Sequence, residues 1–280
     1  MQPGWLRHAV ILLSACLLLV TASYARQGYQ RIVSLNGTIT EIICALGFEQ
    51  QLAGVDVTST YPATVQKLPK VGHNRNISAE PVLALRPDLI LATSNFLPPA
   101  VINQFRHTGV KTVVLEQEYS VEGTKKLIRE VAAALQASAR GEALCQQLDK
   151  ERQSLHIVQQ PRKVLFIYAR GTGTLMVAGE GTPLDRIITL AGARNAATGF
   201  RDFRLLTTEA LVAANPDVIL LFDSGLQSLG GINGLLKVPG IPQTTAGKNR
   251  KVVAMDGQLL SGFGPRLIQA VRELSEKINA

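Results

Sequence analysis

The sequence lacks most of the patterns that mark metal centres, nucleotide sites and hydrolases. Its three cysteines include no Cys-x-x-Cys pair, and its four histidines follow no zinc-type spacing. The glycines between 171 and 181 do not form the G-x-G-x-x-G loop that opens a helix, because a predicted strand over 175–178 interrupts them. Neither a G-x-x-x-x-G-K-[ST] run nor a G-x-S-x-G elbow is present. We therefore predict no nucleotide site and no enzymatic activity.

Blocks of like charge are also missing. The chain carries 29 Lys and Arg against 21 Asp and Glu, a net charge of +8, but these residues are scattered. Proteins that bind nucleic acid usually cluster their basic residues, so we predict no nucleic-acid partner and at most a preference for anionic ligands. With 46% hydrophobic residues over 280 positions, the chain can form two domains of ordinary size with buried cores.

Residues 1–25 are predicted to be a signal peptide. A short polar start leads into an apolar run over 9–20, and Ser23-Tyr24-Ala25 places small residues at the two positions that determine cleavage. The run of about a dozen apolar residues is shorter than the roughly 20 needed to span a bilayer. We expect the mature chain to begin near Arg26, outside the cytoplasm.

The cysteines allow one alternative to simple secretion. Leu13-Ser14-Ala15-Cys16 resembles a bacterial lipoprotein cleavage box, whose product would carry a lipid on Cys16. The apolar run continues beyond this cysteine to Val20, which favours a cleavable signal over a lipid anchor. Cys44 and Cys145 lie in apolar helical stretches far apart in the chain, and we predict that both are free thiols packed as small apolar groups.

From residue 31 onward, short apolar segments alternate with helical ones. Strands are predicted over 31–35, 52–56, 89–93 and 111–116, with helices between them. This alternation predicts a parallel sheet covered by helices on both faces. Ser78 is positioned to cap the helix that begins at Ala79.

The same pattern occurs twice in the chain. Gly37-Thr38-x-x-Glu41 matches Gly181-Thr182-x-x-Asp185 in residue type, and Glu80 with the Pro-Asp pair that follows it matches Glu209 with its own pair. We therefore predict an α/β fold of two similar parallel-sheet lobes with a ligand cleft between them. The predicted domains are 26–138, a polar connecting helix over 139–160, and 161–280.

His73 is the most suggestive histidine of the chain. It lies in the polar loop 72–76, immediately before the capped helix, whereas His107 and His156 are interpreted as surface residues. A loop histidine is more often a solvated side chain than a metal ligand, and Arg75 is equally often a solvated charge. These residues by themselves leave both interpretations open.

A set of motifs gives this loop a family context. Val71-Gly72-x-x-Arg75-x-Ile77-Ser78-Ala79-Glu80 is followed in order by matching segments over 85–90, 176–196, 206–220, 230–244 and 262–267. From about Arg31 to the C-terminus, the set resembles the periplasmic haem-binding proteins of bacterial haem-uptake ABC transporters. The resemblance implies a monomeric, non-enzymatic protein of the periplasm that captures haem for iron acquisition.

The resemblance also implies protein partners. Haem would pass to an inner-membrane permease and its ATPase, with an outer-membrane haem receptor acting upstream. In this class one glutamate on each lobe docks onto arginines of the permease, and the matching residues are Glu80 and Glu209. The helix dipole alone also favours a carboxylate in a first turn, so the symmetric placement of the two residues is what supports docking.

The chain departs from the family at the iron ligand. The resemblance implies a tyrosine after Val71-Gly72 and an arginine two residues later, but here His73 precedes Arg75. Since imidazole is a good ligand of haem iron, we predict that His73 replaces the phenolate and that Arg75 pairs with a propionate. The alternative is that the ligand is lost and something else is bound.

The second lobe is expected to contribute Arg170, which stands where some relatives have a histidine after the first strand of this lobe. It would pair with the other propionate, and apolar surface could come from Phe96, Met176 and Phe203. Two other functions remain as alternatives: a binder of ferric siderophore or cobalamin in the same class, and a secreted chelatase-like enzyme. The removable signal and the lack of a second acid or base near His73 disfavour the enzyme.

Overall fold

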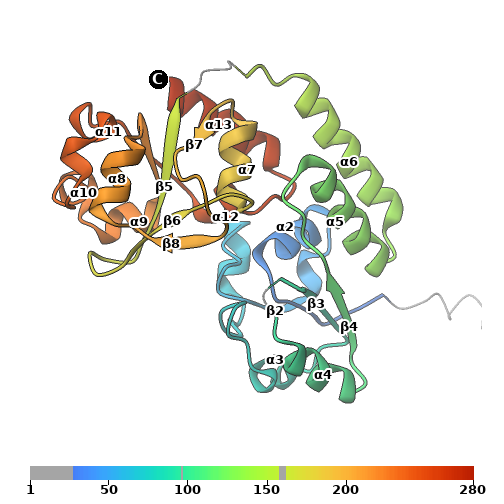
Figure 1. Cartoon of the computed structure of the whole chain (residues 1–280). Coiled ribbons are helices and arrows are strands. Elements are labelled where there is room, and N and C mark those ends of the chain that lie inside the picture. The colour runs from blue at the N-terminus through green and yellow to red at the C-terminus, as the bar shows by residue number, and fades with distance from the viewer. Residues whose placement is uncertain (1–27, 96, 158–161) are drawn as a thin grey trace, which may run out of the picture.

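The computed structural model describes residues 28–95, 97–157 and 162–280, so the predicted signal peptide, Cys16 and Phe96 lie outside the described residues. Two α/β lobes lie beside each other, and α6 (Ser138–Gln153) runs along the right side in Figure 1. This architecture confirms the predicted fold class. No helix within the described ranges is long and apolar enough to cross a membrane.

The N-terminal lobe is built on a parallel sheet with the strand order β2-β1-β3-β4. Its strands are β1 (Ile32–Ser34), β2 (Leu52–Val55), β3 (Leu89–Thr93) and β4 (Lys111–Leu115). Its helices are α2 (Gly37–Ala45), α3 (Ala79–Ala84), α4 (Pro99–His107) and α5 (Val121–Ala134). The central strands β1 and β3 are buried at every residue, as expected of a sheet covered on both faces. The four predicted strands of this lobe are confirmed.

The C-terminal lobe has a mixed sheet, which corrects the prediction that both sheets are parallel. The strand order is β10-β9-β5-β6-β8, and β7 pairs with the start of β5. Its strands are β5 (Lys163–Ala169), β6 (Leu175–Ala178), β7 (Arg194–Asn195), β8 (Phe203–Leu205), β9 (Val218–Phe222) and β10 (Val252–Met255). β6 runs antiparallel to both β5 and β8. The short turn after β5 returns the chain along the same strand, which a parallel pairing would not permit.

Seven helices surround the mixed sheet. They are α7 (Pro183–Leu190), α8 (Thr208–Ala214), α9 (Asp223–Ser228), α10 (Gly231–Leu235), α11 (Thr245–Lys248), α12 (Gly257–Ser261) and α13 (Leu267–Asn279). The order β7-β5-β9-β10 repeats the order β2-β1-β3-β4, with parallel pairing in both. The predicted duplication therefore describes the common framework, and β6 with β8 forms an antiparallel extension specific to the C-terminal lobe.

Polar residues precede two helices of the N-terminal lobe, α2 and α3. Asn36 caps α2 by accepting hydrogen bonds from the N–H groups of Thr38 (2.8 Å) and Ile39 (3.2 Å). Ser78 precedes α3 as predicted, but its side chain makes no capping hydrogen bond. Pro81, the third residue of α3, has no N–H, which removes one of the two donors that a capping side chain can use.

The connecting helix differs from the solvated connector that its polar sequence predicts. α6 ends at Gln153 instead of near 159, and it packs along α5 through Gly141, Cys145 and Leu148, which are buried. Cys145 and Cys44 are both free thiols, as predicted. Burial raises the pKa of the Cys44 thiol to about 12, which keeps it protonated and unreactive near neutral pH.

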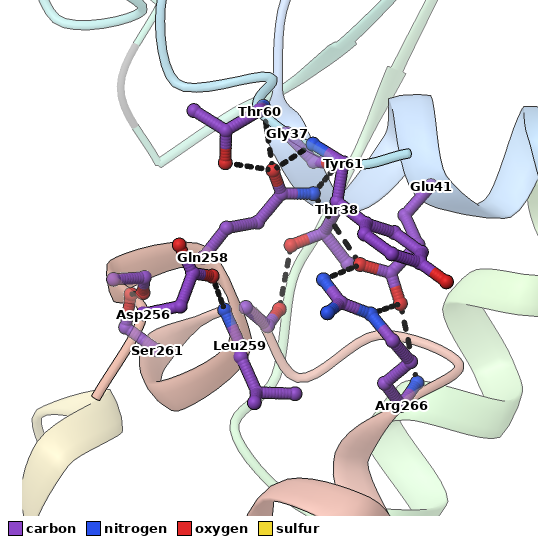
Figure 2. A network of polar contacts seen from close by, with 12 residues as sticks. Gly37, Thr38, Glu41, Thr60, Tyr61, Asp256, Gln258, Leu259, Ser261 and Arg266 are labelled. Atoms are coloured by element: carbon purple, nitrogen blue, oxygen red, sulfur yellow. Dashed lines mark hydrogen bonds and ion pairs between the residues drawn. The ribbon is translucent and has the colours of Figure 1, made fainter. Parts of the chain in front are cut away.

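A second connection joins the lobes through the segment 256–266, which holds α12 and the turn before α13. Arg266 forms a two-pronged ion pair with Glu41 of α2, with Nη2–Oε2 and Nε–Oε1 distances of 2.7 and 3.0 Å (Figure 2). The side chains of Glu41 and Arg266 are 7% and 16% exposed. The guanidinium carbon of Arg266 also lies 3.5 Å from the ring centroid of Tyr61.

Gln258 strengthens this connection with its whole amide group. Its Oε1 accepts hydrogen bonds from the backbone N–H groups of Thr60 (2.7 Å) and Tyr61 (3.0 Å), and its Nε2 donates to the Gly37 carbonyl (2.8 Å; Figure 2). The Gly262 carbonyl accepts from Thr38 Oγ1 at 2.6 Å. One buried apolar cluster also includes residues of both lobes. The lobes are thus held together at the segment 256–266 as well as by the chain that follows α6.

We expect Glu41→Ala to destabilise the protein by roughly 3 kcal/mol, because it leaves the Arg266 guanidinium largely buried without its partner. Glu142→Ala is the matched control, since the Glu142–Arg129 pair is about half exposed on both sides and such pairs contribute at most about 1 kcal/mol. Denaturant unfolding of the two variants measures the difference. Equal losses of stability would contradict the role assigned to Glu41.

Candidate functional site

The His73 loop is attached to the edge of the N-terminal sheet. The Val71 N–H donates to the Val55 carbonyl at 3.1 Å, and the Val57 N–H donates to the Gly72 carbonyl at 2.9 Å. Gly72 has a φ of +116°, which residues with a side chain rarely adopt. The segment 70–72 therefore runs beside the carboxyl end of β2, and the turn at Gly72 places His73 at this end of the sheet.

His73 is half-buried and has a defined hydrogen-bonding state. Its Nδ1 accepts a hydrogen bond from the backbone N–H of Arg75 at 3.2 Å, and its carbonyl accepts one from the Asn76 N–H at 2.7 Å. Because Nδ1 holds the lone pair in this contact, the neutral ring carries its proton on Nε2. Coordination of a metal through Nε2 requires the proton to leave Nε2, and a shift to Nδ1 would break the bond to Arg75.

Arg75 lies near a tyrosine that sequence reasoning did not single out. Tyr119 follows β4, and its ring packs edge-on against Phe263, with the two ring centroids 5.5 Å apart. Burial raises the pKa of Tyr119, and the Asn95 hydrogen bond and the Arg75 charge oppose this shift. The charge of Arg75 therefore acts on Tyr119, which follows β4 of the same lobe.

The structure places the predicted Arg170 on the other lobe. It is exposed just after β5, with its guanidinium carbon 5.6 Å from the ring centroid of Tyr168. Tyr168 is half-buried and packs edge-on against Phe222 at 6.2 Å. The sequence prediction did not single out Tyr168. The sequence does show that Tyr168 and Arg170 flank Ala169, the last residue of β5.

Glu80 and Glu209 occupy equivalent positions in the two lobes. Each is exposed in the first turn of a short helix, α3 or α8, and each helix leads into a central strand, β3 or β9. In Figure 1, α3 lies at the bottom of the N-terminal lobe and α8 at the left of the other, both away from α6. His107 and His156 are exposed, in agreement with their interpretation as surface residues.

A cavity of about 300 Å³ lies within the C-terminal lobe, beside α8. Apolar groups line most of it, including Leu165, Val177 and Phe200. It does not include His73, Arg75 or Arg170. Across the described ranges, no group of three or more His, Cys, Asp and Glu residues could hold a metal ion.

The chain is similar to known proteins along most of its length. The model of the periplasmic binding protein family matches residues 32–259. An uncharacterised ABC transporter substrate-binding lipoprotein of Bacillus subtilis (strain 168), YvrC, is 30% identical over 89% of this chain and 80% of its own length. A vitamin B12-binding protein of Pectobacterium carotovorum subsp. carotovorum (strain PC1) is 26% identical over 94% of this chain and 93% of its own length.

Solved structures of haem-binding proteins resemble the chain in both fold and sequence. The periplasmic haem-binding protein RhuT from Roseiflexus sp. RS-1, in its apo form, is 41% identical, with a TM-score of 0.85 over 90% of this chain and 98% of that one. A variant of the haem-binding protein HmuT with a tyrosine replaced by alanine is 30% identical, with a TM-score of 0.82 over 89% of this chain and 80% of that one. In a second HmuT variant, alanine replaces an arginine that lies two positions after that tyrosine. In a third, alanine replaces a histidine that lies earlier in the chain.

We expect Tyr119→Phe to remove one phenol that ionises at a pH above the ordinary value of about 10. Because the folded-state pKa is raised, the neutral phenol contributes stability below the unfolded pKa, and this contribution is lost as the pH rises above it. Near-ultraviolet absorbance across an alkaline titration measures the ionisation. If Tyr119→Phe removed a transition at or below the ordinary pH for a phenol, the expectation would be contradicted.

Proposed function

Because the chain belongs to the periplasmic binding protein family, whose members bind substrates for transport, we propose that it captures haem in the periplasm and delivers it to an inner-membrane ABC importer for iron acquisition. The observation that carries the choice of haem is the 41% identity with a haem-binding protein over 90% of the chain. The vitamin B12-binding relative is 26% identical over a similar share.

In this proposal the iron is bound from both lobes. His73 supplies an imidazole from the N-terminal lobe, and Tyr168 supplies a phenol oxygen from the C-terminal lobe, both of which are known types of haem ligand. The residues replaced in the HmuT variants support this choice. They are a histidine, a later tyrosine and an arginine two positions after that tyrosine, and this chain has His73, Tyr168 and Arg170 in the same order. For His73 Nε2 to bind iron, its proton would move to Nδ1, and the hydrogen bond from the Arg75 N–H would be released.

The two arginines are assigned to the haem carboxylates. Arg75 and Arg170 stand next to the proposed ligands on opposite lobes, and both are exposed. A guanidinium can pair with a carboxylate through two parallel hydrogen bonds. One propionate is therefore assigned to each lobe.

Titration with haemin tests the function directly. We expect the wild-type protein to give a saturable Soret change, and both His73→Ala and Tyr168→Phe to shift its maximum and weaken affinity at least about tenfold, or about 1.4 kcal/mol. His107→Ala is the control, because His107 is an exposed histidine on α4. If His73→Ala and Tyr168→Phe both kept the wild-type spectrum and affinity, the assigned coordination would be contradicted.

Cobalamin is the second candidate, and it is favoured by the vitamin B12-binding relative. A binder of cobalamin or of a ferric siderophore would give no saturable Soret change with haemin and would bind its own ligand instead. The same titration, repeated with cobalamin, therefore separates the two candidates.

Glu80 and Glu209 are assigned to docking on the permease. Equivalent charges on two similar lobes suit a two-fold symmetric partner that offers equivalent cations. We expect the double variant Glu80→Lys, Glu209→Lys to lose haem transport and to keep its haem affinity. Glu276→Lys on α13 is the control for added positive charge, since Glu276 is also exposed. Transport by the double variant at the wild-type rate would rule out this role.

A further inference from the structure

We propose that one face of the antiparallel extension β5-β6-β8 is a flat apolar platform on which the porphyrin ring lies. This inference rests on the proposed function and adds the residues that select a planar macrocycle. In the strand register, Met176 of β6 is paired with Tyr168 of β5 and with Leu205 of β8. Directly paired residues project from the same face of a sheet, so these three side chains form one row across the three strands.

The opposite face of the extension is occupied by other contacts. Arg204 neighbours Leu205 on β8, and its guanidinium carbon lies 4.6 Å from the ring centroid of Phe200. Phe200 and Val177 line the cavity beside α8. Because successive residues of a strand point to opposite faces, Leu205 and Met176 are turned away from that cavity.

The platform face is turned toward the N-terminal lobe. Tyr168 contacts Phe222, and a Cβ placed on Gly257 would lie 3.5 Å from the Phe222 ring. The next residue, Gln258, is hydrogen-bonded to the N-terminal lobe. Figure 1 shows β6 and β8 on the side of their lobe that faces the other one.

The outer end of the row is unusually exposed for an apolar side chain. Leu205 is 66% exposed, which is the highest value for a large hydrophobic side chain in the described part of the chain. Met176 and Phe203, which lies two residues before Leu205 on the same face, are half-buried. The row thus runs from half-buried Tyr168 and Met176 to exposed Leu205, and an apolar row that ends beside a charged residue suits a ligand-binding surface.

The chemistry of the platform indicates the shape of its ligand. It is apolar along the row, and Arg170 stands at its inner end beside Tyr168. A flat ring with apolar faces and a carboxylate at its edge suits both features. A corrin ring carries amide groups that project from its faces, and these would meet Met176 and Leu205 without hydrogen-bonding partners. The platform therefore favours a porphyrin over a corrinoid.

The experiment compares haemin with iron-free protoporphyrin IX. We expect Leu205→Ser to weaken the binding of both ligands by a similar factor of about ten, because an apolar contact with the ring does not involve the iron. Arg204→Ser, on the same strand and the opposite face, should change both affinities by less than about twofold. Leu205→Met should retain binding. Both Leu205 and Arg204 are exposed, so these variants do not disturb the core.

Each outcome has a separate meaning. If the wild-type protein binds neither haemin nor protoporphyrin IX, the proposed function fails. If it binds haemin and Leu205→Ser binds both ligands as tightly as the wild type, only the platform is overturned. A loss restricted to haemin would place Leu205 at the iron and would also overturn the platform.

Discussion

The buried ion pair between Glu41 and Arg266 is the constraint on which the arrangement of the two lobes depends. Two charges that are largely removed from water stabilise a structure only when each keeps its partner. The pair therefore penalises any movement that separates α2 from the segment 256–266. With Gln258 holding the backbone of the loop at Thr60, it fixes the junction at a second place besides the chain that follows α6. A ligand bound between the lobes would meet an arrangement that is largely set beforehand.

The matching carboxylates of the two duplicated lobes make different contacts. Glu41 and Asp185 match in the duplicated sequence, but Asp185 stays within its own lobe, where it accepts hydrogen bonds from the Gly181 N–H (3.0 Å) and the Asn195 side chain (3.1 Å). The longer glutamate reaches Arg266 of the other lobe instead. The matched carboxylates thus make a contact within one lobe in the first case and a contact between the lobes in the second.

The two lobes contribute different surfaces to the proposed haem site. The N-terminal lobe offers a polar loop, in which a backbone N–H orients the His73 ring and the charge of Arg75 lies near Tyr119. The C-terminal lobe offers a β-sheet face, since β6 and β8 extend its sheet beyond the duplicated strands. A polar group on one lobe and an apolar face on the other are complementary requirements for a flat ligand with a polar edge.

The sequence by itself determined the α/β class, the duplication, the free thiols and the equivalent positions of Glu80 and Glu209, because hydrophobic periodicity and helix-start residues are local properties. Only the tertiary structure decided the mixed C-terminal sheet, the packing of α6 on α5, and the neighbourhood of Tyr119 and Tyr168. These features depend on residues far apart in the chain: Arg266 meets Glu41 across 225 positions. Local patterns carry no information on such pairs, since register and side-chain direction follow from packing the whole chain.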